Sequence, residues 1–117
     1  MVAGCLWPRI DWWTLGAIND SDTDLLVRVE LRDGTVAQMR FAAHSLDLMM
    51  TLDHPFSGSV SVIDPETCAV LKQVAVQSVG DNTVGIDPDG TIVTWRKDHR
   101  SDPPTTKLPP PNDECRP

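Results

Sequence analysis

The chain has 117 residues, a formal net charge of −7 and three cysteines. This length leaves room for one domain with a modest core. The acidic balance opposes binding to nucleic acids, whose phosphates require clustered Lys and Arg. No stretch approaches the roughly 18 apolar residues of a membrane-spanning helix, so we expect membrane attachment only through a lipid at the N-terminus.

In chain order, alternating apolar positions first predict a strand over residues 12–18 and a hairpin over 24–41. Leu25, Val27, Val29 and Leu31 would share one face of the hairpin, and residues 32–35 would form its turn around Gly34. The polar run 19–24 joins the first strand to this hairpin. These elements together predict a three-stranded meander.

Residues 45–52 also fit the alternation of a strand, which would turn Met50 inward and Met49 outward. Two further hairpins are predicted, from 57–63 with 69–77 and from 83–86 with 91–96, around Asp-Pro-containing turns. In the first of these turns, Cys68 occupies a position that often takes a positive φ angle.

The pattern of about seven short strands predicts an all-β domain over residues 12–99, either an antiparallel Ig-like β-sandwich or a small barrel. Residues 1–11 form a separate N-terminal segment. Residues 100–117 are rich in proline and poor in apolar side chains. They are predicted to be an extended or disordered tail that is dispensable for folding.

The N-terminal segment contains the tetrapeptide Val2-Ala3-Gly4-Cys5. It resembles the lipobox of bacterial lipoprotein signal peptides, whose cysteine receives a diacylglyceryl group. The resemblance implies lipid attachment at Cys5 and an extracytoplasmic location. The charged and apolar regions that precede a lipobox are missing from the chain as written, so a cytoplasmic protein is the alternative.

The stretch Asn19 to Gly34, NDSDTDLLVRVELRDG, resembles the opening of small secreted bacterial β-sandwich domains. In those domains, a polar turn that begins with Asn is followed by a strand and then by an Asp-Gly turn. The resemblance implies an accessory or binding role.

Three carboxylates at alternate positions, Asp20, Asp22 and Asp24, are candidate calcium ligands. They resemble the start of an EF-hand loop, but Leu25 and Leu31 stand where that loop needs Gly and Glu. The alternative is a solvated acidic turn.

Two histidines and two methionines, at positions 44, 49, 50 and 54, offer ligand types that suit copper. The ligand pattern of cupredoxins is absent, because Cys68 is followed by Ala-Val-Leu-Lys. No metal site is predicted from these residues.

Trp12 and Trp13 are adjacent on the first predicted strand, so their rings should lie on opposite faces. One ring would pack inside and the other would be a candidate contact surface, unless a loop or the tail covers it.

Cys68 and Cys115 become an even pair if Cys5 carries a lipid, and an oxidising compartment would then favour a disulfide between them. The alternative is two free thiols, because Cys115 lies in the predicted tail.

No catalytic motif of the common hydrolase, metalloprotease or nucleotide-binding families occurs in the sequence. We therefore expect a non-enzymatic accessory or protein-interaction domain with an unidentified protein partner and no required cofactor. Two alternatives stay open. One is a calcium-stabilised module that binds carbohydrate or another ligand, and the other is a structural subunit of a larger assembly.

Overall fold

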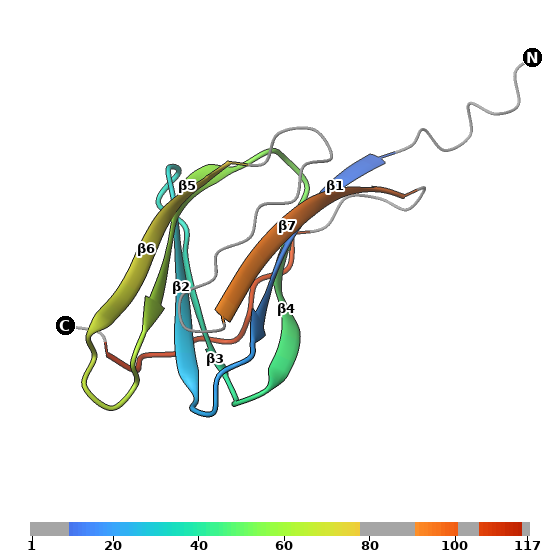
Figure 1. Cartoon of the computed structure of the whole chain (residues 1–117). Coiled ribbons are helices and arrows are strands. Elements are labelled where there is room, and N and C mark those ends of the chain that lie inside the picture. Colours follow the sequence, from blue (N-terminus) through green and yellow to red (C-terminus); the bar gives the residue numbers. More distant parts are fainter. Residues whose placement is uncertain (1–9, 78–90, 101–105, 116–117) are drawn as a thin grey trace, which may run out of the picture.

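The computed structural model describes residues 10–77, 91–100 and 106–115. Its strands form two antiparallel sheets that face each other (Figure 1), with strand orders β4-β1-β7 and β3-β2-β5-β6. The all-β prediction is confirmed, and the described strands form a sandwich because they do not join into one closed sheet. Within the described residues, no helix is long and apolar enough to cross a membrane.

The strand bounds follow the predicted alternation closely. The three-stranded sheet contains β1 (Ile10–Asn19), β4 (Ser45–Leu52) and β7 (Thr91–Arg100). The four-stranded sheet contains β2 (Leu25–Leu31), β3 (Val36–Phe41), β5 (Ser57–Ile63) and β6 (Val70–Gln77). The strand predicted over 83–86 lies outside the described residues, whereas the one predicted over 91–96 is the first part of β7.

The core lies between the two sheets. Leu15 and Ala17 of β1 meet Val27 and Val29 of β2 in one apolar cluster, and all four side chains are fully buried. Each buried Val or Leu contributes about 1.5 to 3 kcal/mol relative to an exposed one. The alternation that predicted these strands is therefore the pattern that forms the core.

The predicted three-stranded meander is wrong in one respect, because β1 belongs to the other sheet. β2 pairs with β3 and β5, and the β2–β3 hairpin is confirmed with Gly34 at φ 97°. At the end of β1, Asn19 is fully buried, and its Nδ2 donates to the carbonyls of Phe41 and Ala42 at 3.2 and 3.1 Å. These bonds anchor a crossover between the sheets where a hairpin was expected.

A β-bulge corrects the predicted orientation of the methionines. Leu15 pairs with Met50 and Gly16 with Leu48, so Met49 is an extra residue in β4. Both methionines are buried, at 3 % and 1 % exposure. A bulge interrupts strict alternation, and for this reason Met49 does not point outward.

The β5–β6 hairpin is also confirmed, with Cys68 in its turn. Cys68 has φ 61°, as predicted, and its N–H donates to the carbonyl of Asp64 at 2.7 Å. The bond closes the turn and presents the Cys68 side chain at one end of the four-stranded sheet.

Candidate functional site

Residues 106–115 form a segment that we call the C-terminal strap. It begins at β4, where Lys107 and Thr51 exchange backbone hydrogen bonds of 2.8 and 3.0 Å. From there it crosses β3 and β2 and ends beside the β5–β6 turn (Figure 1). Residues 106–115 therefore connect the two sheets, as an ordered form of the tail that the sequence predicted to be extended or disordered, and the predicted domain boundary at residue 99 stays a prediction.

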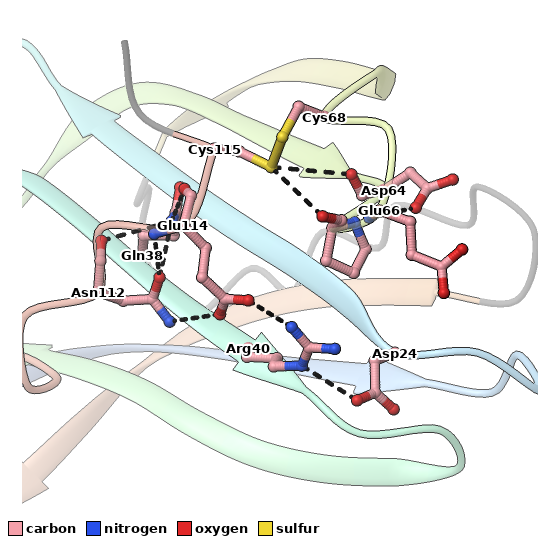
Figure 2. A network of polar contacts seen from close by, with 10 residues as sticks. Asp24, Gln38, Arg40, Asp64, Glu66, Cys68, Asn112, Glu114 and Cys115 are labelled. Atoms are coloured by element: carbon pink, nitrogen blue, oxygen red, sulfur yellow. Dashed lines mark hydrogen bonds and ion pairs between the residues drawn. A yellow bond between two sulfur atoms is a disulfide. The ribbon is translucent and has the colours of Figure 1, made fainter.

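Gln38 on β3 is the central contact of the strap. The side chain is 2 % exposed, and its Nε2 donates to Asn112 Oδ1 at 3.0 Å and to the Glu114 carbonyl at 2.7 Å (Figure 2). Its Oε1 accepts a bond from Arg28 Nε at 2.7 Å, and Arg28 also donates to the Cys115 carbonyl. The buried amide is satisfied largely by the strap, because buried polar groups need partners.

Beside this network, two buried apolar side chains lie among polar neighbours on the outer face of the four-stranded sheet. Leu26 and Ile63 are directly opposed across β2 and β5 and are almost fully buried, although neither belongs to the cluster between the sheets. This apolar pair lies on the face that the strap crosses.

A cleft of about 320 Å³ lies next to the strap and is lined by Thr23, Asp24, Arg40, Asp64, Pro65 and Glu66. Arg40 Nε donates to Asp24 at 3.0 Å, and Arg40 also forms an ion pair with Glu114 of the strap (Figure 2). The hydrogen bond from Arg40 is the main reason that the pKa of the Asp24 carboxyl lies below its usual value of 3.8, with the Ala43 amide as the second cause.

Substitution Arg40→Gln should move the pKa of Asp24 upward, toward its ordinary value. A depressed carboxyl pKa stabilises the fold above the unfolded-state pKa, and this stabilisation is lost as the pH falls through the folded-state pKa. The variant should therefore lose part of its acid dependence of stability below about pH 4. NMR titration of the Asp24 carboxyl measures the shift directly.

Asp33 is the internal control, because its depressed pKa is caused first by hydrogen bonds from Thr35. Its titration should not change in Arg40→Gln. An unchanged Asp24 pKa in this variant would contradict the assigned cause.

Two of the three predicted calcium ligands contact other side chains in the structure. Asp24 is bound to Arg40, and Asp22 Oδ1 lies 2.7 Å from Nε2 of His44. The Asp20 side chain lies on the same turn. Among the described residues, no group of three or more His, Cys, Asp or Glu side chains is placed to hold a metal ion.

The structure joins Cys68 and Cys115 in a disulfide with a Cα–Cα distance of 5.3 Å. This is the pair that the sequence suggested, and it fastens the strap to the β5–β6 turn. Cys5 lies outside the described residues. Trp13 is partly buried against the core, whereas the side chain of Trp12 is not among those described.

Sequence reasoning missed the exposure of β6, an edge strand of the four-stranded sheet. Val70 and Leu71 are 57 % and 43 % exposed, and most other side chains of β6 are exposed as well. A bulge opposite Val62 and Ile63 leaves Leu71 as an extra residue. The sequence did contain a signal, because apolar and polar residues do not alternate in Val70-Leu71-Lys72-Gln73. Such a pattern is typical of an edge strand with a bulge, which does not bury every second side chain on one face.

Both cysteines among the described residues are in the disulfide, so neither offers a free thiol nucleophile. His44 contacts Asp22, and His54 Nδ1 lies 2.8 Å from Asp53. These exposed histidine–aspartate contacts lie on loops.

Comparison with known proteins gave no match to a family model, to a curated protein or to a solved structure. The likeness of residues 19–34 to secreted bacterial β-sandwich domains therefore stays a prediction.

Proposed function

We propose that the protein is an extracytoplasmic, non-enzymatic interaction domain whose β6 edge receives an extended segment of a partner protein. The observation that carries the proposal is the exposure of Val70 and Leu71 on an edge strand. An edge strand presents backbone N–H and C=O groups that an added strand can pair with, and exposed apolar side chains supply the anchor contacts.

The character of the edge supports this proposal. Natural edge strands are commonly protected by charged residues, Pro, bulges or a covering segment. β6 carries two of these protections, a bulge at Leu71 and the charged Lys72, but within the described residues no strand or covering segment pairs with its outer side, which leaves the edge open. By contrast, the strap pairs with β4 at Thr51. A fifth strand beyond β6 would cover side chains that are now exposed to water.

The disulfide supports the extracytoplasmic part of the proposal, because such bonds persist mainly in oxidising compartments. The net charge of −7 favours a protein partner over one rich in phosphate. A lipid on Cys5 would tether the domain to a membrane surface. Intact-mass analysis of protein from its native host distinguishes a lipidated Cys5 from an unprocessed Met1.

Site-specific photo-crosslinking tests the interaction surface. A photoreactive amino acid at Leu71 should give a discrete crosslinked product in the native host. The matched control is Val36, which is similarly exposed at 44 % but lies on β3. The double variant Val70→Lys with Leu71→Lys should prevent binding without unfolding the domain, because both side chains are already exposed.

Amide exchange then tests the mode of binding. With the crosslinked partner purified, the amides of β6 should become protected from hydrogen exchange. Equal crosslinking at positions 71 and 36, or partner binding that leaves β6 amides unprotected, would rule out strand addition at this edge.

A further inference from the structure

The strap lies across the outer side of β2 and β3 as a bound peptide would. Four side chains alternate onto this outer side and form two directly opposed pairs, Leu26 with Arg40 and Arg28 with Gln38. We call these four residues the outer patch. It combines one apolar side chain with two guanidinium groups and an amide, so it can offer both apolar contact and hydrogen-bond donors to a segment that crosses it.

The outer patch contacts both the backbone and a carboxylate of the strap. Gln38 Nε2 donates to the Glu114 carbonyl at 2.7 Å, and Arg28 donates to the Cys115 carbonyl at 3.1 Å. Arg40 forms an ion pair with the Glu114 carboxylate (Figure 2). Every residue has a main-chain carbonyl, so the first two bonds do not depend on side-chain identity, whereas the ion pair selects an acidic residue. Another extended segment with a carboxylate at this place can make the same contacts.

The contacts of the strap other than its disulfide are exchangeable. Every residue from 106 to 115 keeps partial or full exposure to solvent. The ion pair between Arg40 and Glu114 is exposed, and exposed ion pairs contribute little to stability. The hydrogen bonds to carbonyls can be replaced by bonds to another peptide or to water, so their net contribution is modest. The disulfide is therefore the contact that fixes the end of the strap on the outer patch.

The disulfide can be reduced from the side of Cys68. This residue is exposed in the β5–β6 turn, whereas Cys115 Sγ lies 3.9 and 3.7 Å from the carbonyl oxygens of Asp64 and Pro65. Exposed disulfides are commonly the labile ones. A thiolate of a dithiol reductant would attack Cys68 Sγ, and Cys115 would leave as a thiolate that takes up a proton. The second thiol of the reductant would then displace Cys68, so two electrons pass to the protein and the reductant becomes a disulfide.

We propose that the outer patch is a binding site for an acidic, extended segment of a partner protein, and that the strap occupies this site until a dithiol reductant opens the bond between Cys68 and Cys115. The site lies on the face of the four-stranded sheet and is distinct from the β6 edge. Charge complementarity favours an acidic segment, because the outer patch places two guanidinium groups on adjacent strands of a chain with net charge −7. The sequence Asn112-Asp113-Glu114 of the strap is an example of such a segment.

Fluorescence anisotropy with a labelled synthetic peptide tests the site. The peptide has the sequence of residues 106–115 with Cys115→Ser. The protein is the full chain with Cys5→Ser, which prevents disulfide exchange, and with Asn112→Ala and Glu114→Ala, which weaken competition from its own strap. Because a tethered segment competes at an effective concentration of about millimolar, reduction with dithiothreitol should tighten peptide binding about tenfold or more. Equal affinity in both redox states, or no binding to the reduced chain, would overturn the proposal.

Substitutions then assign the contacts in the reduced chain. Arg28→Gln and Arg40→Gln should each weaken peptide binding about tenfold, since each removes a hydrogen bond from a charged donor. The matched control is Arg32→Gln, an exposed residue in the turn of the same hairpin, which should bind the peptide as the parent does. A peptide with Glu114→Gln requires no change to the protein and should also bind more weakly. Equal losses in all three protein variants would indicate general charge attraction and would contradict the site.

The side-chain amide of Gln38 reports release of the strap without any peptide. In the oxidised Cys5→Ser chain it is 2 % exposed and donates to Asn112 and Glu114, so its protons should exchange slowly with solvent. Reduction should speed this exchange, as NMR measures it. The amide of Asn19 is the internal control, because it is fully buried and bonded to carbonyls outside the strap, and it should stay protected. A Gln38 amide that stays protected after reduction would show that the disulfide does not control the strap.

Discussion

Replacement of Cys68 and Cys115 by Ser should lower the free energy of unfolding by about 4 kcal/mol, the chain-entropy value for cysteines 47 residues apart. The bond closes a long loop that contains all of β6 and β7. Its loss therefore raises the conformational entropy of the unfolded chain considerably. Urea unfolding of the oxidised parent and of the double variant, followed by tryptophan fluorescence, measures the difference.

Reduction provides the matched control for this result. Dithiothreitol should lower the unfolding midpoint of the parent and leave that of the double Cys→Ser variant unchanged. A parent whose midpoint does not respond to reduction would show that the bond is absent in solution or does not stabilise the fold.

The strap should stabilise the domain beyond the effect of its disulfide. In the double Ser background, removal of residues after 105 leaves the buried amide of Gln38 without Asn112 and Glu114. It also removes the segment that crosses the outer face of the four-stranded sheet, where Leu26 is buried. A further loss of stability in the truncated chain would therefore separate the polar and packing contacts from the covalent bond.

The strands were predictable because alternation is a local property. β2 shows this most clearly, since its buried Val27 and Val29 are separated by one partly exposed residue, Arg28. The sheet to which β1 belongs was not predictable in this way. It depends on pairing with β4 and β7, which lie far along the chain. Asn19 supports the crossover through side-chain bonds to carbonyls more than 20 residues away in sequence.

The contacts of the strap were not predictable for a related reason. Its composition is rich in proline and low in apolar side chains, which is typical of disordered segments. Its order comes from Gln38, which lies 74 to 76 residues away in sequence from its partners in the strap, and from the disulfide. Amino-acid composition does not reveal contacts between residues that are so far apart in sequence.

The candidate sites show the same difference between local features, which the sequence predicts, and contacts between distant residues, which it does not. The spacing of Asp20, Asp22 and Asp24 suggested a shared cation, and this stays a prediction. The spacing did not indicate that Asp22 contacts His44 or that Asp24 contacts Arg40. The positive φ of Cys68 was predictable, because it follows from the local geometry of a turn.

Gly58→Ala should destabilise the domain by about 3 kcal/mol or more, at the upper end of overpacking effects. Gly58 faces Leu31 where β5 pairs with β2, and a Cβ atom there would lie 2.1 Å from the carbonyl oxygen of Glu30. The next contacts are also with backbone atoms, at 2.8 and 2.9 Å. Gly58 also pairs with Val76 of β6, so its backbone is held on both sides and cannot move aside as a side chain can. The ends of β2 and β5 must therefore separate locally.

Gly34→Ala is the matched control, since Gly34 has φ 97° but a Cβ atom at this position would meet no other atom within 4 Å. Its cost should be limited to backbone strain, about 1 to 2 kcal/mol. Urea unfolding of both variants compares the two costs, and hydrogen exchange should be fastest at the β2 and β5 amides of Gly58→Ala. If the free energy of unfolding fell less in Gly58→Ala than in Gly34→Ala, β2 and β5 would not lie as close together at Gly58 as their pairing requires.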